Sequence, residues 1–529
     1  MDPTLTESNS PEWTRILIPA FLGILAVDFL AFGPALSFDF LVRSDDQAYI
    51  YRNPFLKDLS WDNLAAIFSA NHFGTYFPVT LVSFSLDHTL WGRNPFGYHL
   101  TQILLHALNT FLVLAILLQA GAPRLVAIGT AFLFTVHPVH VEGVAWVASR
   151  KNLLTAFFVL LSIFFYVRHT GRSGKTGASY GFCFLSFILS LLTQAIAVML
   201  PVVMVLYDLC VVRRGWKIAE KIPFFLGSLA AGLIAVYTHW ETGEIREYYG
   251  GSFAVSALFT LRIYWDYLGS LALPFSLSPH YFHQKSQLLG VAGIVALVLV
   301  PLTIVGALFR LRSHPFFSFA VGWFVVWLLP VSNLMPVAKL RHDRYLYLPS
   351  LALFFMLAYF LFRSPWFRAD VRRGWVVVGI LVVLWGGMSG QYALTFASSR
   401  ALWERVAQTQ PDWPEAQFEA GLQAWRVGDR DGALTYYRKA LMNDPENAPA
   451  WNNLGAISLE EGQYGRARAF LERAVLANPD FPDTYRNLAV LAYRTGTDLD
   501  RIPRWKARYD RARSAKPKKR YHLGPFQMR

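Results

Sequence analysis

Charged side chains are scarce in this sequence: Asp, Glu, Lys and Arg make up 16% of its 529 residues. An average soluble domain has about 25%, so the composition excludes a single soluble globule, and the 54% of hydrophobic residues excludes a disordered chain. Cysteine is scarcer still, because Cys183 and Cys210 are the only two and each lies inside an apolar run. This excludes a disulfide-stapled secreted fold and predicts two buried thiols. The class that remains is a polytopic membrane protein, with room for a soluble appendage.

The net charge of +14 is concentrated at the C-terminus, where residues 501–529 contain eleven Lys or Arg and one acidic residue. A basic tail can bind nucleic acid, but no nucleic-acid motif accompanies this one. A tail beside a membrane meets anionic lipid headgroups more simply. We therefore expect membrane lipids, and no nucleic acid, among the partners.

Apolar runs of spanning length recur from Ile16 to about Leu394. The segment 254–274 is set apart, because it carries Arg262 and Asp266, and we expect it to be an interfacial or short helix. One member of the tight pair 178–193 and 195–212 is expected to be short or re-entrant. The eleven predicted spans are 15–35, 99–120, 125–147, 152–168, 178–193, 195–212, 222–239, 288–309, 315–331, 345–362 and 375–394.

Basic loops predict the orientation of these spans. With the N-terminus inside, every cytoplasmic loop is basic, and an odd number of spans leaves the C-terminal region outside. We expect the inner membrane of a bacterium with the C-terminal region in the periplasm, or the endoplasmic reticulum membrane in a eukaryote. The cytoplasmic cations are Arg124, Arg168, Arg172, Lys175, Arg213, Arg214, Lys217, Lys221, Arg310, Arg312, Arg363, Arg368, Arg372 and Arg373.

A period of 34 residues appears after the last span. Gly421 recurs as Gly455 and Ala433 as Ala467, which is the spacing of tetratricopeptide repeats, each a pair of antiparallel helices. Two repeats are clear, at 414–447 and 448–481, and a degenerate third begins near Pro482. Such a stack can bind an extended peptide or another helix, or it can only pack on the membrane part. The predicted domains are 1–394 (membrane, with a long outer loop at 36–98), 395–500 (repeats) and 501–529 (basic tail).

Polar residues gather in segments that the orientation places outside. Asp45 and Asp46 lie in RSDDQAYI, directly after the first span. Adjacent carboxylates near a membrane interface suit a general base or a cation site. The alternative is an ordinary solvated loop or a helix cap.

The third predicted span ends in HPVHVEGVAW, which contains His137, His140 and Glu142. Such residues are expensive at this depth. Hydrogen bonds to a substrate or to the first outer loop are the preferred interpretation. Zinc is a second one, although Glu142 at i+5 points away from the face that the two histidines share.

Cations follow in two further outer segments. Arg150 and Lys151 lie in SRKN, and Arg341, His342 and Arg344 lie in RHDRYLYLPS, with Lys339 just before. Cationic groups at this level can hold a lipid-linked phosphate, and an arginine can do so with two hydrogen bonds. For Arg344, a structural pair with Asp343 or an interfacial anchor is the alternative.

Taken in order, these segments resemble a known family. DDQAYIYRNP (45–54), VHPVHVEGVAWVASRKNLL (136–154), PVVMVLYDL (201–209) and DRYLYLPS (343–350) are similar to the transmembrane and tetratricopeptide repeat proteins, whose membrane part resembles protein O-mannosyltransferases. The resemblance implies an all-α fold: a polytopic GT-C-like helical domain of about eleven spans, followed by a tetratricopeptide-repeat solenoid.

The resemblance also implies an activity. Such enzymes transfer a sugar, mannose or a similar one, from a polyprenyl phosphate to an acceptor hydroxyl at the outer membrane face, with inversion. The resemblance implies that Asp45 is the catalytic base, with Asp46 as its partner. It also implies that cations such as Arg344, Arg341 or Arg150 stabilise the negative charge of the lipid phosphate. No metal cofactor is required, although a divalent metal remains an option. We expect an acceptor protein or peptide to be presented by the repeats.

The sequence departs from the family at one position. Where the family often has a lysine just before PVVMVLYDL, this chain has Thr193, Gln194 and Ala195. This departure favours an alternative function, a non-catalytic membrane scaffold that recruits envelope or pilus-type proteins through its repeats.

Overall fold

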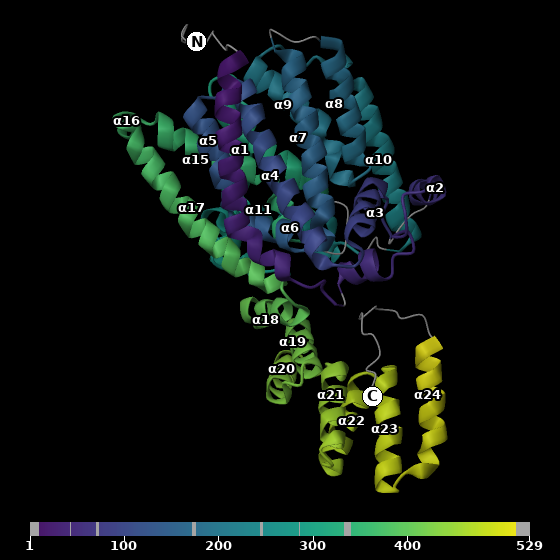
Figure 1. Ribbon diagram of the computed structural model, residues 1–529. Coiled ribbons are helices and arrows are strands. Elements are labelled where there is room, and N and C mark those ends of the chain that lie inside the picture. Colours follow the sequence, from purple (N-terminus) through teal and green to yellow (C-terminus); the bar gives the residue numbers. More distant parts are fainter. Residues whose placement is uncertain are drawn as a thin grey trace. The chain divides into compact units, whose positions relative to one another are not determined.

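The computed structural model describes residues 10–42, 44–69, 74–171, 176–243, 247–284, 286–332 and 340–514. These residues form helices joined by loops, and the chain divides into two compact units at Ser398 and Ser399 (Figure 1). Among the residues that the sequence analysis names, Lys339, Arg172, Lys175 and the part of the basic tail from residue 515 onward lie outside the described residues.

The first unit, residues 1–398, is built from apolar helices. Their bounds are α1 (Ser10–Phe32), α4 (Pro95–Gln119), α5 (Arg124–Val136), α6 (Val141–Ala145), α7 (Arg150–Thr170), α8 (Thr176–Leu191), α9 (Leu200–Tyr207), α10 (Ile222–Glu241), α11 (Phe253–Ala272), α13 (Val291–Phe309), α14 (Pro315–Leu328), α15 (Ser350–Arg363) and α17 (Val371–Ala393). Short helices α12 (Ser286–Leu289) and α16 (Pro365–Arg368) lie between them.

Length and composition identify seven of the described helices as candidate membrane spans, or eight if a bent pair counts as one. The bent pair is formed by residues 124–136 and 138–145, and shorter apolar helices occupy three more of the predicted positions. Every predicted span is therefore helical, but the count of eleven is not established. The predicted exception, 254–274, forms α11, which is not among the candidates. The chain is a multi-pass membrane protein.

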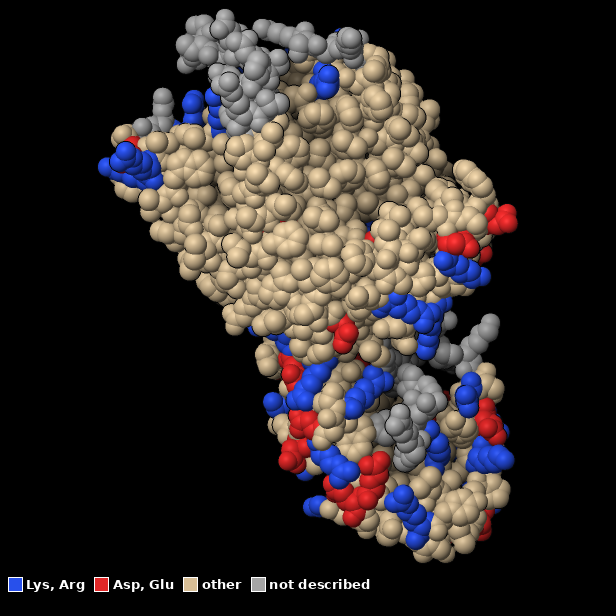
Figure 2. Space-filling model, in the orientation of Figure 1, with Lys and Arg blue, Asp and Glu red and all other residues tan. Residues whose placement is uncertain are grey.

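Helix α4 lies at the centre of this unit and packs against α1, α5 and α7 (Figure 1). Polar residues on α4 hold its neighbours. Asn109 Nδ2 donates to the backbone oxygen of Leu153 on α7 at 3.0 Å, and His106 Nδ1 lies 2.6 Å from the Tyr347 hydroxyl. In Figure 2 the middle of this unit shows a broad uncharged surface, as expected for a surface that faces lipid.

The break between α5 and α6 follows from a proline. The residue before a proline is pushed out of the helical region of backbone space, and His137 has φ −70° and ψ 132°. Helix α5 therefore ends at Val136, Pro138 begins a short 3-10 turn, and α6 follows with an axis bent by 54°. The bend places Glu142 in the interior, near the start of α7.

The predicted outer loop, residues 36–98, consists of loops and short helices. A π-helical turn (Gln47–Tyr51), α2 (Trp61–Ser69) and α3 (Pro78–Trp91) make up most of it. Helix α3 packs against α4 and α7. The segment that carries the acidic pair is thereby brought to the start of α7.

The second unit is a helical solenoid, as the period of 34 predicts. Its helices are α18 (Ser399–Thr409), α19 (Pro414–Arg426), α20 (Arg430–Asn443), α21 (Ala448–Glu460), α22 (Tyr464–Ala477), α23 (Pro482–Thr495) and α24 (Ile502–Ser514). A Cβ on Gly421 would lie 2.8 Å from Tyr437, and one on Gly455 would lie 2.7 Å from Leu471. Only glycine therefore lets the paired helices approach this closely.

The described start of the predicted basic tail is not an extended tail. Residues 502–514 form α24, and Trp505 and Tyr509 on this helix pack on the apolar cluster that contains Tyr485 and Leu488 of α23. Helices α23 and α24 thus complete a third pair. The predicted boundary at residue 500 falls just before this helix, so the described part of the predicted tail is helical.

Candidate functional site

The two adjacent aspartates have different surroundings. Asp46 is buried, and its carboxylate accepts hydrogen bonds from the backbone N–H of Leu41, at 2.9 Å, and of Ala148, at 2.8 Å. Burial raises the pKa of Asp46 to about 7. Asp46 therefore fastens the loop of residues 36–98 to the turn before α7, and its carboxylate points into the protein.

Asp45 is half-buried, and no described residue forms a hydrogen bond or an ion pair with its carboxylate. It interacts electrostatically with Lys151 and Arg344, which are cationic, and with Tyr49. The Asp45 carboxylate is therefore within electrostatic range of two cations and is bonded to neither of them.

The two cations reach this position from different elements. Lys151, in the first turn of α7, donates from Nζ to the Tyr49 hydroxyl at 3.3 Å and lies over the rings of Tyr49 and Phe77, 5.5 Å and 5.9 Å from their centroids. Arg344 lies on the loop before α15, with its guanidinium 5.1 Å from the ring centroid of Trp146. Aromatic faces stabilise a cation while leaving its N–H groups for a ligand.

Glu142 holds the Arg344 loop. It is fully buried, and Oε1 accepts from the Arg344 guanidinium at 2.8 Å while Oε2 accepts from the Arg344 backbone N–H at 2.9 Å. His342 Nδ1 lies 3.1 Å from the same Oε1. The alternative pairing of Arg344 with Asp343 is therefore wrong, because Arg344 pairs with Glu142.

Asp343 and Arg341 face the other side of this loop. Asp343 accepts hydrogen bonds from the Tyr281 hydroxyl at 2.7 Å and from the Tyr392 hydroxyl at 3.3 Å. Burial, and next the like charge of Glu142, raise the pKa of Asp343 to about 7.

Arg341 is held by α11 and by the loop that follows it. The guanidinium donates to Ser270 Oγ at 2.7 Å, lies 3.5 Å from an Asp266 oxygen and covers the Tyr281 ring at 3.8 Å. The structure thus uses Arg341 to attach the loop to α11, and it does not bring Arg341 to Asp45.

Both predicted histidines are fully buried, with their ring nitrogens engaged inside the protein. His137 Nε2 lies 3.1 Å from the Leu271 oxygen, and Nδ1 accepts from the Val139 N–H at 3.3 Å. His140 Nδ1 lies 2.7 Å from the Phe134 oxygen, and Nε2 lies 3.0 Å from Ser350 Oγ. These contacts stabilise the bend between α5 and α6.

The described residues do not provide the set of ligands that the zinc interpretation requires. Among the described residues, no three His, Cys, Asp or Glu side chains come together in a way that could hold a metal ion. The acidic group of this segment, Glu142, instead pairs with Arg344 and His342.

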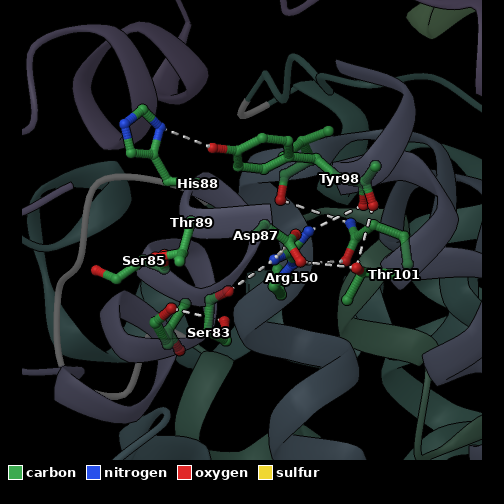
Figure 3. A network of polar contacts seen from close by, with 12 residues as sticks. Ser83, Ser85, Asp87, His88, Thr89, Tyr98, Thr101 and Arg150 are labelled. Carbon is green, nitrogen blue, oxygen red and sulfur yellow. Dashed lines mark hydrogen bonds and ion pairs between the residues drawn. The ribbon is translucent and has the colours of Figure 1, made fainter. Parts of the chain in front are cut away.

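Arg150 does not reach the site either. It is fully buried, forms an ion pair with Asp87 on α3 and donates to the Tyr98 oxygen on α4 at 2.9 Å (Figure 3). The second Asp87 oxygen accepts from Thr101 Oγ1 at 2.8 Å. Arg150 is therefore an internal link between α3, α4 and α7. Although Arg150 and Lys151 are adjacent in the sequence, their side chains contact different parts of the protein.

The structure thus places Lys151 and Arg344 within electrostatic range of Asp45 and adds two aromatic residues that have no predicted role. These are Tyr49 and Trp146. The signal that could have revealed Tyr49 is its position one helical turn after Asp45.

Gln194, at the departure from the family, lies beside the start of α3. The backbone oxygens of its neighbours Leu192 and Thr193 accept from Val79 N at 3.2 Å and from Thr80 Oγ1 at 3.4 Å. The Gln194 Oε1 atom is buried and has no hydrogen-bond partner among the described residues.

Comparison with known proteins agrees with these two units. Residues 424–492 match a family model described as tetratricopeptide repeat. Protein O-mannosyl-transferase TMTC1 of Homo sapiens is 24% identical over 501 residues, which cover 82% of this chain and 56% of the relative. TMTC2 of Homo sapiens, also named a protein O-mannosyl-transferase, is 33% identical over 155 residues, 28% of this chain and 18% of the relative. The chain spans between about a fifth and about half of the length of these two relatives.

Two solved structures are also similar at low identity. ArnT from Cupriavidus metallidurans in the apo state is 16% identical, with a TM-score of 0.37 and coverage of 82% of this chain and 76% of ArnT. The oligosaccharyltransferase of Archaeoglobus fulgidus is 10% identical, with a TM-score of 0.39 and coverage of 80% and 59%.

The chain is therefore a multi-pass membrane protein with a C-terminal tetratricopeptide-repeat unit, and the part of it that the structure describes is helical. The resemblance predicted from its sequence is confirmed, because its relatives are the protein O-mannosyl-transferases that carry the name TMTC.

Proposed function

We propose that this protein is a membrane glycosyltransferase with a GT-C-like membrane domain. It transfers a sugar, mannose or a similar one, from a polyprenyl phosphate to a hydroxyl group of a protein acceptor at the outer membrane face. The observation that carries the proposal is the Asp45 carboxylate, which interacts electrostatically with Lys151 and Arg344 and is bonded to no described residue. The names of the relatives supply the sugar and the class of reaction.

In the proposed reaction Asp45 is the general base. It removes the proton of the acceptor hydroxyl while that oxygen bonds to the anomeric carbon from the face opposite the carrier, so the configuration inverts. The bond between the anomeric carbon and the carrier oxygen breaks, and its electron pair stays on the lipid phosphate. Lys151 and Arg344 stabilise the charge that develops there.

The same arrangement accounts for the other residues. Asp46 positions Asp45 through the backbone bonds to Leu41 and Ala148, and the aromatic rings of Tyr49 and Trp146 hold the two cations in place. Two cations offset the charge of the phosphate, so the proposal requires no metal cofactor. His137, His140 and Arg150 keep positioning roles within the protein.

A scaffold is the second candidate, and Gln194 favours it because the family often has a cation at this position. In that case the repeats recruit partner proteins and Asp45 has no chemical role. The two candidate functions therefore differ in what they predict for Asp45: its loss abolishes transfer by an enzyme and has no effect on a scaffold.

The test is a transfer assay in membranes that contain the wild type, Asp45→Asn or Asp62→Asn. Asp62 is an exposed carboxylate of the same outer loop, on α2, and serves as the matched control. With labelled polyprenyl-phosphate mannose we expect label in protein for the wild type and for Asp62→Asn, and a loss of at least about 100-fold for Asp45→Asn. Equal labelling by all three proteins across several donor sugars would contradict the proposal and favour the scaffold.

A further inference from the structure

We propose that Glu142 is a positioning residue that keeps Arg344 directed at the donor phosphate and prevents it from pairing with Asp45. This inference rests on the proposed function. Arg344 has two carboxylates within electrostatic reach, Glu142 and Asp45, and it is bonded to only one of them. The choice between these two partners decides whether the proposed base is free.

The contacts of Glu142 are directed at Arg344 from two sides. One carboxylate oxygen accepts from the guanidinium at 2.8 Å, and the other accepts from the backbone N–H of the same residue at 2.9 Å. Charge-assisted bonds of this kind are stronger than neutral ones and fix orientation. A single fully buried carboxylate therefore bonds both the side chain and the backbone of Arg344, whose guanidinium also lies over the rings of Trp146 and Tyr345.

His342 also contacts Glu142, at 3.1 Å, but the other anchors of the loop do not involve Glu142. Asp343 is bonded to the hydroxyls of Tyr281 and Tyr392, and the Tyr347 hydroxyl is held by His106 at 2.6 Å and by Asn109 at 3.1 Å. These anchors remain when Glu142 is changed. The loss of Glu142 thus releases the Arg344 side chain rather than the whole loop.

A released Arg344 has a second carboxylate within electrostatic range. It is 8% exposed, and an arginine in so little water needs a counter-charge. Asp45 is the remaining carboxylate that acts on it electrostatically. An ion pair between Arg344 and Asp45 would occupy the base and withdraw a cation from the phosphate in one step.

The experiment is a double-mutant cycle with Glu142→Gln and Arg344→Gln, measured as transfer from polyprenyl-phosphate mannose. Glu142→Gln keeps the shape but removes the charge, and we expect transfer to fall about 100-fold. In the Arg344→Gln background the same change should have almost no further effect, because residues that act through one another are non-additive. The KM for the donor should rise while the KM for the acceptor stays, and Glu142→Asp should recover part of the rate.

Asp343→Asn is the matched control, since it changes a buried carboxylate of the same cluster that is bonded to tyrosines. In the double variant, the fold-loss of transfer caused by Asp343→Asn should multiply with the fold-loss caused by Arg344→Gln. If Glu142→Gln lowers transfer by the same factor with and without Arg344, Glu142 acts independently and the inference is overturned.

The binding of undecaprenyl phosphate separates this inference from the proposed function. If the wild type binds this lipid but transfers no sugar, the proposed function fails, and the same cycle in Kd tests the inference alone: non-additive losses support it and additive losses overturn it. If the wild type does not bind the lipid at all, the inference is overturned together with the proposed function.

Discussion

Two neighbouring carboxylates, Asp45 and Asp46, acquire different properties because only one of them meets backbone donors. Asp46 turns inward to the N–H groups of Leu41 and Ala148, and Asp45 stays half-buried within electrostatic range of Lys151 and Arg344. Different environments of this kind are how two carboxylates take separate roles in one site. In the proposed enzyme, Asp46 contributes geometry and Asp45 contributes the chemistry.

The raised pKa of Asp46 predicts a pH dependence of stability. In the unfolded chain an aspartate releases its proton near pH 4, whereas folded Asp46 keeps it until about pH 7. Folding therefore retains a proton between these values, and the free energy of unfolding falls as the pH rises from about 4 to about 7. Asp46→Asn removes this group, so its thermal unfolding temperature in detergent should fall less steeply over that range. Parallel curves for the two proteins would contradict the prediction.

At the scale of the elements, buried polar side chains link neighbouring helices, and one of these links lies at a helix start. Arg150 begins α7 and joins it to α3 through Asp87 and to α4 through Tyr98. A cation buried this completely is stable only while its partner remains. The position of α3, and with it the outer loop, depends on this pair.

The ion pair of Arg150 and Asp87 predicts that removing one partner costs more stability than removing both. Asp87→Asn leaves a buried charge without its partner and should cost about 3 to 5 kcal/mol, whereas the double change Asp87→Leu with Arg150→Met removes both charges and should be much closer to the wild type. Thermal unfolding of the purified proteins measures this order. The double variant should also bind undecaprenyl phosphate, because Arg150 is internal; a specific loss of lipid binding in a stable double variant would instead place Arg150 in the phosphate site.

At the scale of the whole molecule, the features that repeat along the chain could be predicted and the contacts between distant segments could not. The 34-residue period predicts the repeats because Gly421 and Gly455 occupy equivalent close approaches, and apolar runs predict the positions of the candidate membrane helices. The acidic pair and the cations stand out because charge is scarce. Which cation lies near Asp45 depends on tertiary contacts between α7, the predicted outer loop and the loop before α15. Arg150 and Arg344 are both cations in predicted outer segments, and for this reason the sequence does not reveal that their roles differ.

The two units have separate cores. We therefore expect a single Gly→Ala substitution in the repeats to affect the function of the repeats without affecting that of the membrane unit. Ala favours a helix by about 1 kcal/mol over Gly, so Gly465→Ala on α22, where a Cβ meets nothing within 4 Å, should stabilise the repeats slightly. Gly455→Ala places the Cβ 2.7 Å from Leu471 and should cost about 1 to 3 kcal/mol through overpacking. In the intact protein, Gly455→Ala should lower the unfolding temperature of the repeat unit and weaken transfer to protein acceptors, while undecaprenyl phosphate binding matches that of Gly465→Ala. Equal loss of lipid binding and acceptor transfer would mean that the membrane unit depends on the repeats for its own site.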